Sequence, residues 1–397
     1  MKRFKKKYIC HVYILIWFLY NFHWQSVGEA FPILNALSNL FLGINLAISL
    51  YYTYYFLTHY KQTRFFVSMN YLLISLILYG SISLLMGAKH ENISPGTYLI
   101  GALRSFLPIY TCYVFTKIGY LNEKAIKVWF WMFLSQSIYI FFVGRTVMRG
   151  VSLLDMGEMY TNNISYMFVS IFPWLYFWKD RRGLTYVIIA LLLFLTFFGL
   201  KRGAIMIVLM ATIYFFLHQF KQGSIYAKIT IIAILSLFVI KGASIIENMY
   251  DNSDIFQKRY ASTLEGDTSG RDRIVNNLLD IYFSSDIIDV IFGKGADATL
   301  KYGLFAHNDW VELLFNQGLV GFFLYFFFWF NIVLLWRKQI KLKSEISFLL
   351  GLCIICYLPK TFFSMWYSNA NIMMTLPIGY SLAIISNNRF VKVLDSK

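Results

Sequence analysis

Long apolar stretches, separated by short polar connections, run through the sequence from end to end. A helix needs about 20 mainly apolar residues to cross the hydrocarbon core of a bilayer, and most of these stretches are near that length. The pattern predicts an all-α membrane protein with about twelve transmembrane helices. The predicted spans are 8–20, 34–57, 65–86, 97–116, 126–143, 163–178, 184–200, 203–220, 226–242, 307–336, 345–363 and 370–387.

One long polar segment, 243–306, interrupts this pattern. It divides the chain into an N-terminal bundle (1–242, about nine predicted helices), the loop itself, and C-terminal helices with a short basic tail (307–397). Within the loop, apolar and polar residues alternate with a helical period from Arg271 to Phe292, which predicts an amphipathic helix along the membrane surface. Gly293-Lys294-Gly295 is expected to end that helix and turn the chain; it is not a P-loop, because no Gly-Lys-Ser/Thr follows.

The composition supports a multi-pass membrane protein. Of 397 residues, 58% are hydrophobic and 14% are charged, whereas soluble domains carry about 25% charged residues. The net charge of +16 does not indicate nucleic-acid binding, because no single face collects the basic residues and most of them fall in predicted cytoplasmic loops. All four cysteines lie in apolar stretches, and the pair Cys353 and Cys356 lacks the second pair that a zinc site would need.

The distribution of charge predicts an orientation. The basic run from Lys2 to Lys7 precedes the first apolar stretch as in a signal peptide, but no small-x-small cleavage site follows, so we expect an uncleaved helix. With a cytoplasmic N-terminus, most basic residues fall in cytoplasmic connections and in a cytoplasmic C-terminal tail, as the positive-inside rule requires. The loop 243–306 and the connection 144–162 then face outward. The acidic residues on the cytoplasmic side are Glu123, Asp180, Glu345 and Asp395.

The turn at Lys201 and Arg202 breaks the positive-inside rule, because both cations fall on the outward side. Two interpretations are open. The pair can be side chains that reach from a helix end into the headgroup region, or it can bind an anion at a helix N-terminus, where backbone N–H groups assist. A cation against the usual bias favours a functional hypothesis.

His307 stands in a polar cluster at the start of the span 307–336. Asn308 and Glu312 are four residues apart and would share a helix face. A neutral histidine at an interface can act as a general base for a sugar hydroxyl, although such a histidine more often has a capping or structural role. Gly318 and Gly321 are expected to allow close packing between helices.

Several motifs occur in the order found in one known superfamily. They are Gly199-Leu200-Lys201-Arg202-Gly203-Ala204, Ser269-Gly270-Arg271, Ile291-Phe292-Gly293-Lys294-Gly295, and Ala306-His307-Asn308-(x)3-Glu312-(x)5-Gly318-x-x-Gly321. In these residues, within about 185–335, the chain resembles the O-antigen ligase and Wzy-type O-antigen polymerase superfamily. The family turn usually reads Ser-Arg-Gly, whereas Lys201 takes the Ser place here. A Trp after the Gly-Arg and a Pro before the Gly-x-Gly are common in the family and absent here.

The resemblance implies a membrane glycosyltransferase with a GT-C-like architecture that uses an undecaprenyl-diphosphate-linked sugar and inverts the anomeric carbon. It implies catalytic roles for His307, Arg202 and Arg271, of which the cations bind the diphosphate that such a leaving group requires. The implied substrate contacts are Lys201, Asn308, Glu312, Arg273, Arg145 and Arg149. Asn308 and Glu312 are also candidates for supporting partners of His307, and Arg145 and Arg149 can equally be solvated.

No metal or other cofactor is expected, since no carboxylate pair with the character of metal ligands is present. The implied partners are the lipid-linked oligosaccharide, membrane lipid and a chain-length regulator protein, with no nucleic acid. The implied location is the bacterial inner membrane, with the site on its periplasmic face.

Three functions are compatible with these patterns. The first is a polysaccharide polymerase for O-antigen or capsule, which the loosely matching motifs favour because polymerases in the superfamily vary more. The second is an O-antigen ligase that transfers glycan to lipid A-core. The third is a polysaccharide flippase or transporter, which should place charges at the membrane midplane and show a repeat between its halves. No repeat is visible, and the one cation near the middle of a predicted span, Arg104, stands alone.

Overall fold

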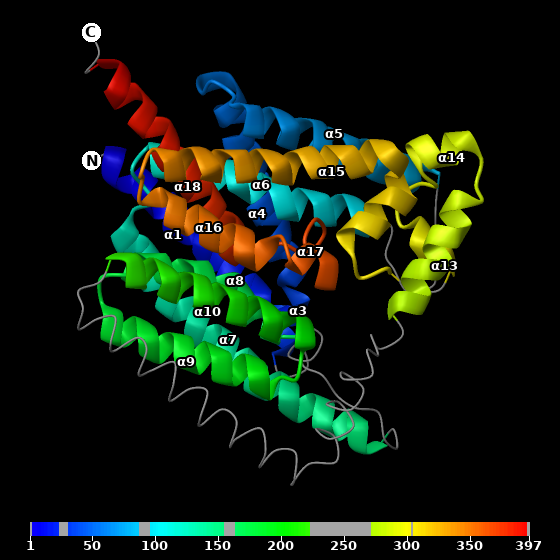
Figure 1. Ribbon diagram of the computed structural model, residues 1–397, viewed down its shortest axis with the longest axis horizontal. Coiled ribbons are helices and arrows are strands. Elements are labelled where there is room, and N and C mark those ends of the chain that lie inside the picture. Colours follow the sequence, from blue (N-terminus) through cyan, green and yellow to red (C-terminus); the bar gives the residue numbers. More distant parts are fainter. Residues whose placement is uncertain are drawn as a thin grey trace.

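The computed structural model describes residues 2–23, 31–86, 96–154, 163–222, 271–302 and 305–394. Every regular element in these ranges is a helix. The longer helices run side by side along the long axis of the molecule (Figure 1). The first half contains α1 (Lys2–Tyr20), η1 (Asn21–His23), α3 (Pro32–Ala36), α4 (Ser38–His59), α5 (Arg64–Leu85), α6 (Thr97–Lys117), α7 (Glu123–Leu154), α8 (Ser165–Ile171), η2 (Phe172–Trp178), α9 (Arg182–Phe198) and α10 (Arg202–Gln222). The second half contains α13 (Arg271–Phe283), α14 (Ile287–Phe292), η3 (Ala298–Tyr302), α15 (Asp309–Lys341), α16 (Ile346–Tyr357), α17 (Lys360–Phe363) and α18 (Ile372–Leu394).

Seven helices in the described part of the chain are long and apolar enough to cross a bilayer, and α9 and α18 contribute shorter apolar segments. The protein is therefore an all-α membrane protein. Each predicted span that falls on described residues coincides with a helix or with two consecutive helical pieces. The predicted span 226–242 lies outside the described residues, so the number of twelve crossings stays a prediction.

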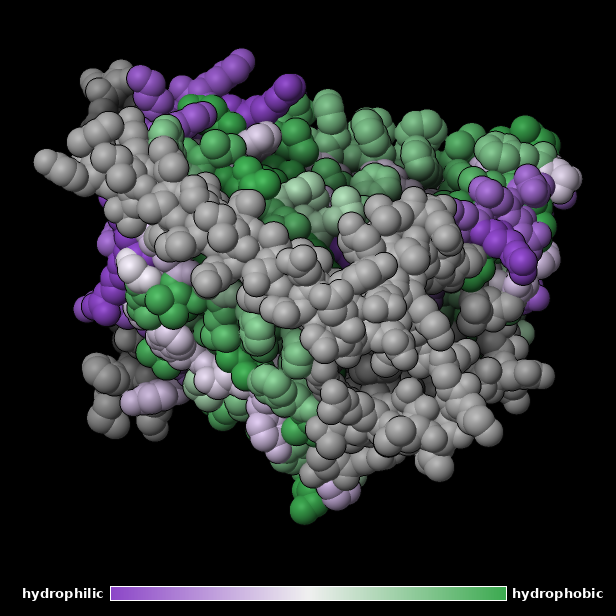
Figure 2. All heavy atoms as spheres, turned by 60° about the horizontal axis from the view of Figure 1, so that its bottom comes forward, coloured by the Kyte–Doolittle hydropathy of each residue, from purple (hydrophilic) through white to green (hydrophobic). Residues whose placement is uncertain are grey.

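Both termini lie at one end of the bundle, whereas α13 and α14 lie at the other (Figure 1). Connections that were predicted to share the cytoplasmic side meet in space: Lys179 forms a 2.6 Å ion pair with Glu345, and Lys117 donates to Asn387 at 2.6 Å. Hydrophilic residues gather at the two ends of the molecule, with hydrophobic residues between them (Figure 2). This arrangement is typical of a bundle whose middle faces lipid.

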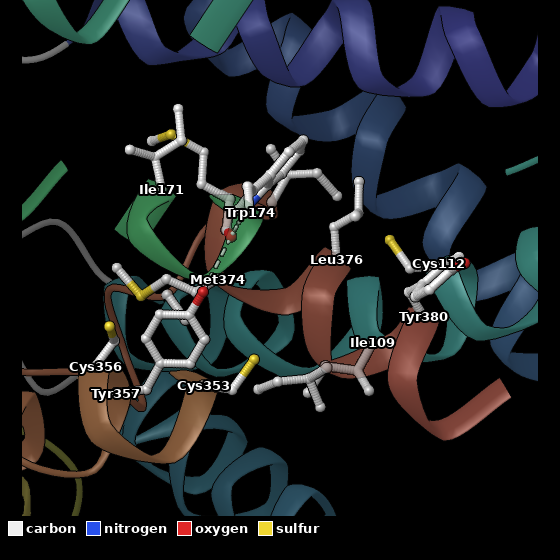
Figure 3. Packing of buried hydrophobic residues seen from close by; sticks show 14 of the residues in the cluster. Ile109, Cys112, Ile171, Trp174, Cys353, Cys356, Tyr357, Met374, Leu376 and Tyr380 are labelled. Atoms are coloured by element: carbon white, nitrogen blue, oxygen red, sulfur yellow. Dashed lines mark hydrogen bonds between the residues drawn. The ribbon is translucent and has the colours of Figure 1, made fainter. Parts of the chain in front are cut away.

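Aromatic and aliphatic side chains fill the interior of the bundle. Trp174 of η2 donates through its indole N–H to the carbonyl of Met373 at 2.7 Å, and the Tyr357 hydroxyl donates to the carbonyl of Ser170 at 3.0 Å. Cys353 and Cys356 lie beside Tyr357 on α16 (Figure 3). All four cysteines are free and buried, so they face the bundle interior.

Three predicted boundaries need correction. Helix α7 continues to Leu154, so residues 144–154, which were assigned to an outward connection, are helical. The predicted span 345–363 is broken, because Pro359 precedes α17 and lacks the N–H that would continue α16. The predicted surface helix Arg271–Phe292 is two helices, since the Asp286 side chain accepts from the N–H of Asp289 at 2.9 Å and starts α14 afresh.

The irregular segment between α17 and α18 is held by buried polar groups. Asp309, which is fully buried, accepts hydrogen bonds from the backbone N–H groups of Trp366 and Tyr367. Lys360 donates to the carbonyl of Met365, and Arg104 donates to the carbonyl of Ser368 at 2.6 Å. Non-helical backbone inside a membrane protein is tolerated when such partners satisfy it. Arg104 therefore does not stand alone, as the sequence suggested; it anchors this segment.

Candidate active site at the end of the bundle

A backbone-to-backbone contact joins the polar loop to α15. The N–H groups of Lys294 and Gly295 donate to the carbonyls of Phe315 and Asn316, each at 3.0 Å. The contact requires glycine on both sides, because a Cβ at Gly293 would overlap the backbone of Asn316, and a Cβ at Gly318 would overlap the backbone of Ile291.

Gly318 also kinks α15. Its φ of 63° and ψ of −157° are non-helical and lie in a region that is essentially restricted to glycine. The kink exposes the carbonyls that the loop then caps. Gly293 ends α14, as predicted. Gly318 packs against Ile291 and Gly293 at the C-terminal end of α14, in line with the close packing between helices that was expected of it.

Glu312 fixes the backbone just before His307. Its carboxylate is fully buried and accepts from the Thr299 hydroxyl at 2.5 Å, from the N–H of Ala306 at 2.9 Å and from the Asn316 amide at 3.3 Å. With these contacts, Glu312 ties η3 and the segment before α15 to one point on α15. Glu312 therefore anchors the residue that precedes His307 in the chain.

The side-chain oxygen of Asn308 caps α15 by accepting from the N–H groups of Trp310 and Val311, at 2.9 and 3.3 Å. A cap of this kind stabilises a helix start by about 1 kcal/mol. Trp310 stacks on Phe362 and donates to the Thr361 hydroxyl at 2.8 Å, which joins this helix start to α17. His307 itself has a φ of 52°, in the left-handed region, and part of its side chain is exposed.

Arg271 begins α13, and its guanidinium reaches the bundle. Its Nη1 donates to the carbonyl of Phe363, at the end of α17, at 2.7 Å. The Tyr166 hydroxyl donates to the same carbonyl at 3.1 Å, and the charge of Arg271 acts on that hydroxyl. Arg271 therefore lies beside α8 and α17, far from both in sequence.

Lys201 and Arg202 form the tight turn between α9 and α10. Leu200 has a φ of 53°, and a Cβ at Gly199 would overlap the Ser165 hydroxyl, so the turn packs closely on the start of α8. The carbonyl of Lys201 accepts from the N–H of Ile205 at 3.0 Å, which makes Lys201 the N-cap of α10. The two cations that were predicted to face outward thus stand at a helix N-terminus, as the anion-site interpretation requires.

The charges of Arg271 and Lys201 both act on His307, which brings three predicted residues from three separate segments together. The pKa of His307 is lowered from 6.5 to about 4. The larger cause is partial removal of water from the imidazole, and the smaller one is the positive charges of Arg271 and Lys201. The imidazole is therefore neutral at physiological pH, and a neutral ring nitrogen can accept a proton.

The remaining predicted residues are less informative. Arg273 lies on α13 with an exposed side chain. Arg145 and Arg149 lie on α7, with side chains outside the described ones. Residues 243–270, which include the Ser269-Gly270 part of the Gly-Arg motif, also lie outside the described residues. Among the described residues, no group of three or more His, Cys, Asp or Glu side chains could hold a metal ion.

Three residues that shape this site were not predicted from the sequence: Tyr166, Asp309 and Lys360. Tyr166 looked like one of many aromatic residues in an apolar stretch, so nothing marked it. Lys360 and Asp309 did carry a signal, because ionisable residues within membrane spans are rare and usually paired. The Lys360 ammonium lies 5.6 Å from the centroid of the Tyr166 ring. The negative charge of Asp309 also acts on this ammonium.

The lowered pKa of His307 predicts an unusual reactivity toward diethyl pyrocarbonate, which modifies only neutral imidazole. In the folded protein, the rate of modification of His307 should stay high down to pH 5 and fall to half only near pH 4. In the denatured chain the rate of modification of the same residue should fall to half near the ordinary histidine pKa of about 6.5. Mass spectrometry of the segment 302–337, in which His307 is the sole histidine, measures both. Equal midpoints in the two states would contradict the prediction.

No protein-family model matches this chain, and no curated protein matches it either.

Proposed function

We propose that this protein is a membrane polysaccharide polymerase, which transfers glycan from an undecaprenyl-diphosphate carrier to a sugar hydroxyl of another lipid-linked repeat. The observation that carries the proposal is the convergence of His307, Arg271 and Lys201 at the end of the bundle that bears α13 and α14. A proton acceptor next to fixed cations suits a reaction whose leaving group is a membrane-bound diphosphate. The motif resemblance supports the same reaction.

The chemistry assigns one task to each group. His307 accepts the proton of the acceptor hydroxyl, whose oxygen attacks the anomeric carbon. The bond between that carbon and the phosphate oxygen breaks, and its electron pair leaves with the lipid diphosphate. Arg271, Arg202 and Lys201 stabilise the negative charge that develops on the diphosphate. A single displacement inverts the anomeric carbon, and no metal is needed to balance the step.

Binding of the donor would also prepare His307 as a base. Removal of water from the imidazole and then the charges of Arg271 and Lys201 lower the pKa of His307 in the free protein. A bound diphosphate places negative charges next to the same cations, which raises the pKa of His307 back toward neutrality. A base with a pKa near the working pH is the most effective one. The imidazole therefore becomes a stronger base when the donor is bound.

The test uses cells that lack the gene, with surface and carrier-linked glycans separated on gels. Loss of a polymerase leaves a single repeat on the final acceptor, and this is the expected result. If full-length polymer instead accumulates on the carrier lipid, the protein is a ligase. If repeats remain on the cytoplasmic side, the protein is a transporter. Purified protein in liposomes with a synthetic diphosphate-linked repeat should lengthen the glycan without added metal.

A further inference from the structure

Tyr166 on α8 is a buried side chain with no assigned task in the proposed reaction. Its hydroxyl donates to the carbonyl of Phe363 at 3.1 Å, and Arg271, whose charge acts on that hydroxyl, donates to the same carbonyl at 2.7 Å. The three groups form a triangle, in which the two side chains donate to one shared carbonyl. This triangle connects α8, α13 and α17, which are far apart in the sequence.

The triangle lies against the first turn of α10. A Cβ at Gly203 would lie 2.6 Å from the Tyr166 hydroxyl and 2.7 Å from the Cβ of Phe363. Glycine at this position therefore permits the close approach, immediately after Arg202. The Lys360 ammonium, 5.6 Å from the Tyr166 ring centroid, contacts the ring through a cation–π interaction. Tyr166 is thus held by its ring and by its hydroxyl.

We infer that Tyr166 is a positioning residue, which acts with the Phe363 carbonyl to hold the Arg271 guanidinium beside the start of α10. Arginine has a long flexible stem, and fixing its guanidinium before the ligand arrives removes an entropic cost from binding. Arg271 and the Lys201–Arg202 turn can then face the same diphosphate. The identity of that ligand rests on the proposed function, whereas the positioning of Arg271 can be tested with no substrate present.

The test measures the midpoint of His307 modification by diethyl pyrocarbonate against pH, because Arg271 is one of the two cations that act on His307. The variants are Tyr166→Phe, Arg271→Gln and the two combined. Arg271→Gln should raise the midpoint by removing a positive charge. Tyr166→Phe should raise it by roughly half a pH unit, because the released guanidinium moves away from the imidazole. The double variant should match Arg271→Gln alone, since Tyr166 acts only through Arg271.

Two further variants serve as controls. Tyr357→Phe also removes a hydroxyl that donates to a backbone carbonyl, but its partners are Ser170 and Met373, so the midpoint should not change. Arg271→Lys keeps the charge but loses the planar group that donates to the Phe363 carbonyl beside Tyr166. Its midpoint should lie above that of the wild type. This variant keeps the test decisive if Tyr166→Phe does not fold.

The inference is overturned if Tyr166→Phe and Arg271→Lys both keep the wild-type midpoint while Arg271→Gln moves it. It is also overturned if the shifts of the two single variants add in the double variant. In the liposome assay, Tyr166→Phe should lower kcat/KM for the lipid-linked donor roughly tenfold, as expected for a misplaced binding group. If the midpoints shift as expected but the wild type transfers no glycan, the positioning stands and the proposed function fails.

Discussion

Replacement of His307 by alanine is expected to abolish polymer formation, with transfer in liposomes slowed roughly 10²–10⁴-fold, the usual contribution of a positioned general base. His307 is the group that can accept the hydroxyl proton next to the cations that bind the diphosphate. Cells that carry the variant should show a single repeat on the acceptor in place of a ladder. The gel for surface glycan measures the defect in cells, and product length in liposomes measures it in vitro.

The backbone at His307 requires a second variant. Its φ of 52° is unfavourable for alanine, whereas asparagine tolerates this region better. His307→Asn therefore separates a local backbone effect from the loss of the imidazole, and it should be as inactive as His307→Ala. His59→Ala, at an exposed histidine that ends α4, is the matched control and should form a normal ladder. A normal ladder with both His307 variants would reject its catalytic role and favour a transporter.

Replacement of Gly293 by alanine is expected to detach the polar loop from α15, at a cost of about 3 kcal/mol from backbone strain and overlap. A Cβ there would overlap the backbone of Asn316 and Gln317, which cannot move without breaking α15. A cost of that size populates the detached state roughly a hundredfold more, so trypsin should cut after Lys294 about a hundred times faster. Peptide mapping over time measures the rate.

Three comparisons sharpen this prediction. Gly318→Ala should have a similar effect, and the double variant should be no worse than either single one, because both substitutions break the same contact. Gly295→Ala meets the same kind of strain, with a φ of 101°, but no atom lies within 4 Å of its Cβ, so its effect should be smaller. Gly43→Ala, in open space on α4, should be neutral. If Gly293→Ala is cut no faster than Gly295→Ala, backbone docking is not what holds the loop.

The sequence by itself determined the class of the protein and the course of its helices. Apolar stretches of membrane-spanning length can hide their backbone groups in a bilayer only as helices, so hydropathy alone placed every predicted span that falls on described residues. The sequence also made Lys201, Arg271 and His307 candidates for the site, because cations and a histidine are unusual next to spans on the predicted outward side of the membrane.

Only the tertiary structure decided how these residues work together. Hydropathy reports whether a residue is buried, but it does not report which residues it meets, and the contacts at this site join segments far apart in the chain. Glu312 proved to be a buried anchor of the backbone before His307, and Asn308 proved to be a helix cap. No local pattern distinguishes Tyr166 from its aromatic neighbours. It lies near Arg271 because α8 packs against α17 and α10.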